Sequence, residues 1–244
     1  MARSSVNFMQ PMTGVMRPMA RITTRTKLDG ASAPFFSSSP PMGRTAWDEA
    51  SRIMTQEREH LIELDSVVGD GDLGLTMSDG FLAAYQAAAA CADDDCGKVL
   101  YAAGKVMSTA VPSTMGTLMA SGLMAAGKQL RGKPEEGVIP TLAAFCSAYL
   151  DGVIARGKAQ RGEKTFVDGL APAVDVLSAA AEADVPADVL ARAKDAAWKG
   201  YEDTETMLAI HGRAATRGEA SRTLRDPGAY VAYLLVSALP AAIG

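Results

Sequence analysis

Residues 116–131 have the sequence GTLMASGLMAAGKQLR, and stretches of this kind decide the fold of the chain. Alanine, leucine and methionine favour helices, whereas the β-branched and aromatic residues that favour strands are scarce. A first helix is predicted from Thr45, a good N-cap, to about Leu64. The other predicted helices are each bounded by Gly, Pro or Asp, and they span residues 78–92, 97–110, 116–131, 138–156, 166–183, 187–210 and 228–243. About eight helices with short links predict an all-α antiparallel bundle, in which abundant alanine lets the helices approach closely.

Composition limits the classes of protein to which the chain can belong. It has 244 residues, of which 48% are hydrophobic and 21% charged, enough for one domain with a sizeable core. No apolar run approaches about 18 residues, so no membrane span is expected. The net charge of −4 disfavours a nucleic-acid partner. Three cysteines without metal-site spacing predict reduced thiols and a cytoplasmic protein.

Residues 1–45 differ in composition from the remainder of the chain. They contain six basic residues and one acidic residue, and they show neither helical nor strand periodicity. We expect a disordered or targeting-like leader over residues 1–45 and a helical domain over residues 46–244. A leader that is rich in Arg and Ser is also typical of organelle transit peptides, in which case an organellar matrix would be the location.

A cluster of acidic residues lies between the first two predicted helices, in the sequence ELDSVVGDGDLG of residues 63–74. Gly69 and Gly71 allow the chain to fold back, so the carboxylates of Asp65, Asp70 and Asp72 can converge. Converging carboxylates repel one another unless a cation lies among them, and hard oxygen ligands select Mg²⁺ or Ca²⁺. A calcium-binding EF-hand is excluded, because the glutamate that its loop requires is replaced by Phe81. The sequence therefore predicts a magnesium–phosphate site, with an ordinary turn and helix N-cap as the alternative.

Three further polar segments precede predicted helices: residues 111–116, 157–165 and 212–228. Free backbone N–H groups at a helix start can receive phosphate oxygens, although an N-cap or a solvated link is the simpler interpretation of each segment. The two histidines are weak candidates for a phosphate carrier. We expect His60 to be exposed on the first helix and His211 to be a loop residue next to Gly212 and Arg213.

Together the four segments resemble the L-subunit (DhaL, or DAK2-type) domain of dihydroxyacetone kinases, from about Trp47 to Ile243. The motifs that carry the resemblance are Leu64-Asp65, Gly69-Asp70-Gly71-Asp72-x-Gly74, Gly116-x-Leu118, the segment from Arg156 to Pro172, Gly212-Arg213-Ala214 and Asp226-Pro227-Gly228-Ala229. The resemblance implies an eight-helix antiparallel up-and-down barrel with a Mg-nucleotide at one rim. It also implies a kinase subunit that is inactive without a K-type subunit, which holds a short ketose. In some members a phosphohistidine phosphocarrier (DhaM-like) rephosphorylates bound ADP, and in others ATP exchanges.

The resemblance also implies roles for individual residues. Asp65, Asp70 and Asp72 would hold two Mg²⁺ ions that bridge the phosphates of ADP or ATP. Residues that would surround the nucleotide are Leu73, Gly74, Leu75, Thr76, Thr114 and Met115 at the phosphates and ribose, Gly157 and Phe166 at the adenine, and Arg213, Asp226, Pro227 and Gly228 closing the site. Arg213 would also be the catalytic cation.

Some positions depart from the family pattern. Leu73 stands where His or Thr is common, Phe166 stands where Met is common, and residues 112–116 read PSTMG where the usual phosphate loop is GGSSG. Each lost hydrogen bond to a nucleotide costs on the order of 1 kcal/mol. Two other functions therefore stay open: a nucleotide-sensing regulatory partner of a transcription factor, and a kinase subunit for another acceptor, such as a tetrulose or a carboxylate on a different carrier.

Overall fold

The computed structural model describes residues 44–133 and 137–243, and helices are the regular structure of these ranges. The α-helices are α1 (Arg44–Gln56), α2 (Arg58–Val68), α3 (Leu73–Ala90), α4 (Cys96–Ala110), α5 (Thr114–Leu130), α6 (Val138–Gly157), α7 (Phe166–Ser178), α8 (Pro186–Asp203) and α9 (Pro227–Ala238). Three 3₁₀ segments accompany them: η1 (Thr204–Thr206), η2 (Arg213–Thr223) and η3 (Leu239–Ala242). Except for its last two residues, the expected leader lies outside the described residues.

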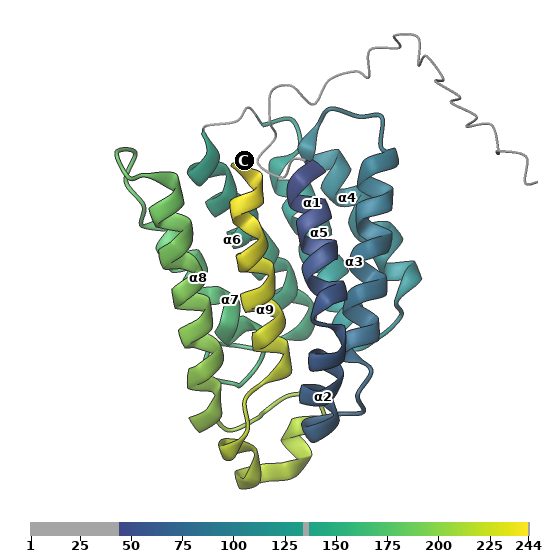
Figure 1. Cartoon of the computed structure of the whole chain (residues 1–244), viewed down its shortest axis with the longest axis vertical. Helices are drawn as coiled ribbons and strands as arrows, with labels where there is room; N and C mark the ends of the chain where they lie inside the picture. Colours follow the sequence, from purple (N-terminus) through teal and green to yellow (C-terminus); the bar gives the residue numbers. More distant parts are fainter. Residues whose placement is uncertain (1–43, 134–136, 244) are drawn as a thin grey trace, which may run out of the picture. The chain divides into compact units, whose positions relative to one another are not determined.

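The helices lie side by side along the long axis of the domain (Figure 1), and their contacts form a closed ring of neighbours. From α3 to α9 each helix packs on the next one along the chain, and α1 closes the ring by contacting both α3 and α9. The predicted first helix is divided at Glu57 into α1 and α2, which still occupy one place in the ring. The prediction of an all-α, eight-helix antiparallel barrel is thus confirmed.

The ring interior is filled by apolar side chains and by close backbone contacts. Met54, Leu61, Met77, Leu100, Met107, Met119 and Leu142 all have 0% exposure. Helices α4 and α5 approach closely at Gly97 and Gly127, where a Cβ on Gly127 would lie 2.6 Å from the carbonyl oxygen of Gly97. The close helix approach that abundant alanine predicted is therefore present, and at this contact it is glycine that permits it.

Several helix ends differ from those predicted. Helix α3 begins five residues earlier than expected, directly after Asp72, and α7 ends at Ser178 rather than at residue 183. Helix α8 ends at Asp203 instead of residue 210, because the chain turns through η1 and then extends at Met207. The earlier start of α3 shortens the loop before it, whereas the earlier ends of α7 and α8 lengthen the loops that follow them, at opposite ends of the barrel.

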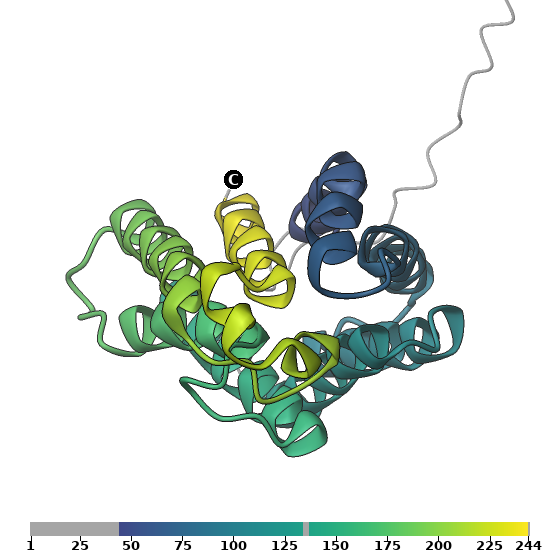
Figure 2. The ribbon, with the colours of Figure 1, turned by 90° about the horizontal axis from the view of Figure 1, so that it is seen from below.

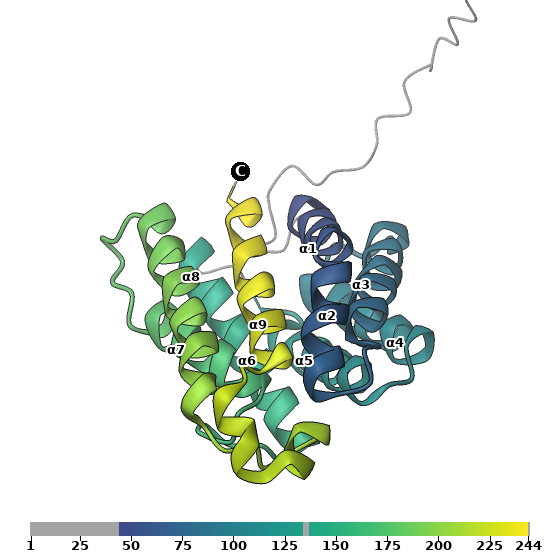
Figure 3. The same cartoon turned by 60° about the horizontal axis from the view of Figure 1, so that its bottom comes forward.

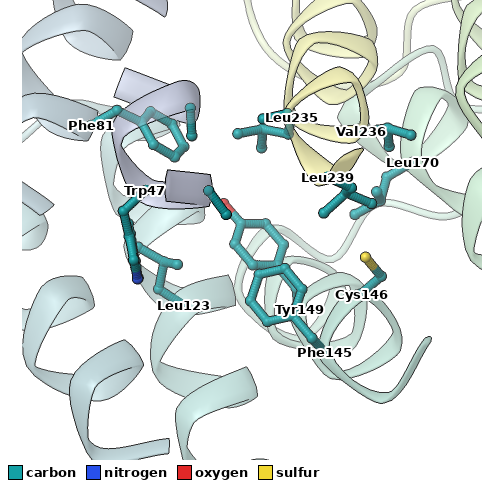
Figure 4. A pocket seen from close by; sticks show the side chains of 13 residues that line it. Trp47, Phe81, Leu123, Phe145, Cys146, Tyr149, Leu170, Leu235, Val236 and Leu239 are labelled. Atoms are coloured by element: carbon teal, nitrogen blue, oxygen red, sulfur yellow. The ribbon is translucent and has the colours of Figure 1, made fainter. Parts of the chain in front are cut away.

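An apolar cavity lies inside the barrel at the end formed by the first turns of α1 and the last turns of α9 (Figure 4). It has a volume of about 40 Å³, and its walls include Trp47, Phe81, Phe145, Tyr149 and Leu239. The helix α6, which contributes two of these walls, is long and apolar enough to cross a membrane by length and composition. It packs between α5 and α7 in the ring, and its buried residues include Leu142, Phe145 and Leu150.

The polar loops gather at the opposite end of the barrel. Because neighbouring helices alternate in direction, the loops before α3, α5, α7 and α9 share one end, together with η2 (Figure 3). Figure 2 shows the barrel from below, where η2 crosses this end between α8 and the helices drawn in blue, α1 to α3. We call this the loop end, and it unites the four polar segments predicted from the sequence.

Candidate nucleotide and metal site

Three carboxylates converge at the loop end, at the turn between α2 and α3. Asp65, Asp70 and Asp72 each offer an oxygen atom, and these oxygens lie within 4.8 Å of one another. Asp65 belongs to the last turn of α2, whereas Asp70 and Asp72 belong to the turn that follows it. The convergence predicted from the sequence is present in the structure.

Glycine is required at two positions of this turn. Gly71 has a φ of +75°, a conformation that L side chains rarely adopt. At Gly69 a Cβ would lie 2.3 Å from Oδ1 of Asp65, so a side chain there would displace a carboxylate of the cluster. The absence of a side chain at Gly69 thus leaves room for the carboxylate of Asp65.

The electrostatics and the hydrogen bonding of the cluster suit a divalent cation. Burial raises the pKa of Asp65 above its ordinary value, and the nearby charges of Asp70 and Asp72 raise it further, while hydrogen bonds from the Leu73 and Gly71 backbone lower it. Asp72 stands at the N-cap position of α3, yet its carboxylate makes no capping hydrogen bond. The alternative of a plain capped turn therefore does not account for Asp72, and the oxygen donor set fits Mg²⁺.

A second chain segment supplies positive charge to this cluster. We call residues 207–226, which connect η1 to α9 and include η2, the arm. Arg213 of the arm places its guanidinium 2.5 Å from a carboxylate oxygen of Asp70. Farther along, Arg217 donates a hydrogen bond to the carbonyl oxygen of Val67, and Ala214 packs against Val68 at the end of α2. Arg213 and Asp70, which are more than 140 residues apart in the sequence, thus form an ion pair at the loop end.

The start of α5 presents a hydroxyl and backbone N–H groups at the loop end. Ser113 caps this helix by accepting a hydrogen bond of 3.0 Å from the backbone N–H of Gly116, so the N-cap interpretation holds for Ser113. Thr114 is exposed, whereas Met115 is half-buried and packs against the core. Thr114 is thus the residue of this segment whose side chain is most accessible to a ligand.

The other residues assigned to the nucleotide differ in accessibility. At the start of α3, Leu73, Gly74 and Thr76 are buried, and Leu75 is 41% exposed. Phe166 is buried, with its ring 6.1 Å from that of Tyr149, and its backbone lies beside Gly228. Gly157, the last residue of α6, faces the side chain of Leu118. The structure thus brings the start of α7 next to the start of α9 and leaves Leu75 facing outward.

Asp226 and Pro227 form the start of α9. Asp226 accepts a hydrogen bond of 2.7 Å from the backbone N–H of Ala229, and its own N–H donates to Thr204. Burial raises the pKa of Asp226 to about 7, against the lowering effects of the Ala229 N–H and of Lys164. Pro227 is buried at the first helical turn, where its missing N–H costs nothing.

Three features of the loop end were not predicted from the sequence. Glu163 pairs with His211 at 2.6 Å, Lys164 is buried with 2% exposure, and Arg217 binds the end of α2. The segment 157–165 is therefore not only a solvated link. His60 is exposed, as predicted, with its ring 5.1 Å from that of Tyr230. The partners of Glu163 and Arg217 are distant in sequence, so no local pattern indicates them.

Comparisons with known proteins agree with this arrangement of residues. The family model described as the DAK2 domain matches residues 67–241. The chain belongs to the DAK2 family. This DAK2 domain is 34% identical over 178 residues to the ADP-binding subunit DhaL of the PEP-dependent dihydroxyacetone kinase of Escherichia coli, covering 72% of the chain and 84% of that relative. As in these relatives, the chain is a kinase subunit.

Two longer proteins contain a similar domain. The L-erythrulose 1-kinase of Mycolicibacterium smegmatis is 33% identical over 193 residues, which are 77% of this chain and 33% of that protein. The crystal structure of the dihydroxyacetone kinase from C. freundii in complex with AMP-PNP and Mg²⁺ has a TM-score of 0.64 and 23% identity, covering 94% of this chain and 37% of that one. The DAK2 domain thus has the fold of one part of that kinase and spans about a third of the length of both proteins.

Proposed function

We propose that the chain is the nucleotide-binding subunit of a two-component ketose kinase. It would bind Mg²⁺ with ADP or ATP at the loop end and transfer a phosphoryl group to a short ketose held by a separate K-type subunit. The observation that carries this proposal is the convergence of Asp65, Asp70 and Asp72 within 4.8 Å, facing Arg213 of the arm. The ADP-binding subunit DhaL among the relatives supports the nucleotide and the need for a partner subunit.

The residues of the loop end have complementary tasks in this proposal. Asp65, Asp70 and Asp72 would hold Mg²⁺, two ions if the site follows the family pattern, and bound Mg²⁺ supplies neutralisation of phosphate charge. Arg213 would stabilise the charge of the transferring phosphoryl group, and the exposed start of α5 at Thr114 would donate hydrogen bonds to phosphate oxygens. Phosphoryl transfer depends chiefly on such positioning and charge stabilisation, which explains why no covalent nucleophile is needed here.

Two phosphoryl donors and two ketose acceptors are candidates for the reaction. A DhaM-like phosphohistidine carrier and ATP are the two donors to compare, and the relative named PEP-dependent favours the carrier. A tetrulose is the second candidate acceptor, because the L-erythrulose 1-kinase is 33% identical to this chain. Assays with dihydroxyacetone and erythrulose, in the presence of a K-type subunit, separate the two acceptors.

A titration of the purified protein with ADP, in the presence and absence of Mg²⁺, tests the site. We expect Asp70→Ala to abolish Mg²⁺-dependent ADP binding while preserving the helical circular-dichroism spectrum. Asp79→Ala is the matched control, because Asp79 is an exposed aspartate of α3 outside the carboxylate cluster. Wild-type ADP affinity in the Asp70→Ala protein would refute the metal role.

A further inference from the structure

The arm that carries Arg213 is held near both ends by two consecutive residues of the loop before α7. Nε2 of His211 lies 2.6 Å from a carboxylate oxygen of Glu163, and the backbone N–H of Ile210 donates to the carbonyl oxygen of Glu163 at 3.4 Å. At the other end, Nζ of Lys164 donates hydrogen bonds to the carbonyl oxygens of Thr204 and Leu224. Glu163 and Lys164 therefore contact the arm at two points that flank Arg213.

The loop that supplies these contacts is itself firmly attached to α7. In the capping box that starts the helix, Asp168 accepts a hydrogen bond from the N–H of Thr165 at 2.8 Å. The same carboxylate also accepts from the N–H of Gly162 at 2.5 Å. The carboxylate of Glu163 also accepts from the N–H of Gln160 at 2.7 Å. Lys164 has a φ of +60° and is 2% exposed, so its side chain turns inward while that of Glu163 stays at the surface. These bonds make the loop a fixed support for the arm.

Arg213, by contrast, has little support from packing. Its side chain is 67% exposed, and it follows Gly212, which has a φ of +66° and open space around it. A residue that is not packed in place depends on its backbone for its position. Before Arg213, the nearest side-chain hydrogen bond between that backbone segment and the body of the protein is the one made by His211, two residues upstream. After Arg213, Ala214 packs against Val68.

We propose that Glu163 and His211 are a positioning pair for Arg213, holding the start of the arm so that the guanidinium faces the carboxylates of the loop end. Lys164 anchors the other end of the same arm. The catalytic part of this proposal rests on the proposed kinase function. The pair itself is a property of the fold that can be measured without nucleotide or partner.

Hydrogen–deuterium exchange of the full-length, ligand-free protein tests the structural part. The variants are His211→Ala, Glu163→Gln and their combination. Arg161→Gln is the matched control, since Arg161 lies on the same loop but pairs with Asp175 of α7 instead of the arm. We expect amide exchange in residues 207–217 to rise about three-fold or more in each single variant. The double variant should show no further rise, because each of the three variants loses the same contact, the one between His211 and Glu163. Exchange in α4 and α5 should stay at the wild-type rate. An arm that exchanges as it does in wild type, or a double variant with additive effects, would overturn the pair.

Kinase assays with a K-type subunit test the catalytic part. In the His211→Ala protein we expect kcat to fall about ten-fold while KM for the Mg-nucleotide stays within about two-fold, because Arg213 is displaced and the metal ligands are not. His211→Lys, which places a hydrogen-bond donor opposite Glu163, should recover most of kcat. Unchanged kcat, or a change in KM alone, contradicts a positioning role. Absence of Mg²⁺-dependent ADP binding in wild type would instead refute the proposed function, and the exchange data would still decide whether the pair holds the arm.

Discussion

Arg213 joins the arm to the carboxylate cluster, because its guanidinium lies 2.5 Å from a carboxylate oxygen of Asp70. We expect Arg213→Gln to lower kcat of the assembled kinase by about a thousand-fold, the scale of arginine contributions to phosphoryl transfer. Mg²⁺-dependent ADP binding should persist, because the three carboxylates remain. Steady-state kinetics beside calorimetric titration measure the two effects separately. Arg192→Gln is the control, as Arg192 pairs with Asp184 on α8. Equal kcat in both variants would remove Arg213 from the mechanism.

Asp226 gives the protein a pH-dependent stability. Its pKa is raised by burial to about 7, so between pH 4 and pH 7 the folded state keeps a proton that the unfolded state has lost. The free energy of unfolding therefore falls as the pH rises through this interval, by at most about 1.4 kcal/mol per pH unit from this group. Asp226→Asn keeps an N-cap for α9 and should remove that slope. Urea unfolding at several pH values measures the difference, and parallel curves for variant and wild type would contradict the assignment.

At the scale of the elements, the contact of α4 with α5 depends on the absence of side chains. A Cβ at position 127 would lie 2.6 Å from the Gly97 carbonyl oxygen and 2.7 Å from the Tyr101 nitrogen, and both are backbone atoms that cannot move aside cheaply. Gly127→Ala should therefore destabilise the protein by about 1–3 kcal/mol, although alanine is the better helix former. Thermal unfolding measures this change. Gln129→Ala, on the exposed face of the same helix, is the control and should differ little from wild type. A stabilised Gly127→Ala protein would show that the helices can separate at no cost.

At the scale of the whole molecule, ligand binding should increase the free energy of unfolding. A ligand that binds only the folded state adds about 2.7 kcal/mol when its concentration is 100 times its Kd. For a protein of this length that corresponds to a rise in Tm of roughly 5–10 °C. We expect this rise with Mg²⁺ and ADP together and not with ADP in the presence of EDTA. A Tm that ADP raises equally with EDTA would show that the nucleotide binds without the metal.

The sequence alone predicted most of the elements and the chemistry of the acidic turn. Helix-forming residues between Gly, Pro and Asp clusters identified the helices, because propensity and hydrophobic spacing act over a few residues. The convergence of Asp65, Asp70 and Asp72 was predictable for the same reason, because it is determined within a stretch of eight residues that includes two glycines. The less accurate helix ends are the start of α3 and the ends of α7 and α8. Beyond α8, the contacts of Lys164 with Thr204 and Leu224 hold the chain on its path to α9.

Local sequence thus determined the fold class, the helices and the group of oxygen ligands, since those follow from interactions between near neighbours. Tertiary structure decided which segments meet. The pairing of Arg213 with Asp70 and of His211 with Glu163, and the burial of Lys164 and Phe166, arise only when alternating helices bring four loops to one end of the barrel. No pattern within a single segment encodes such contacts, because their free energy depends on two surfaces that the chain brings together only on folding.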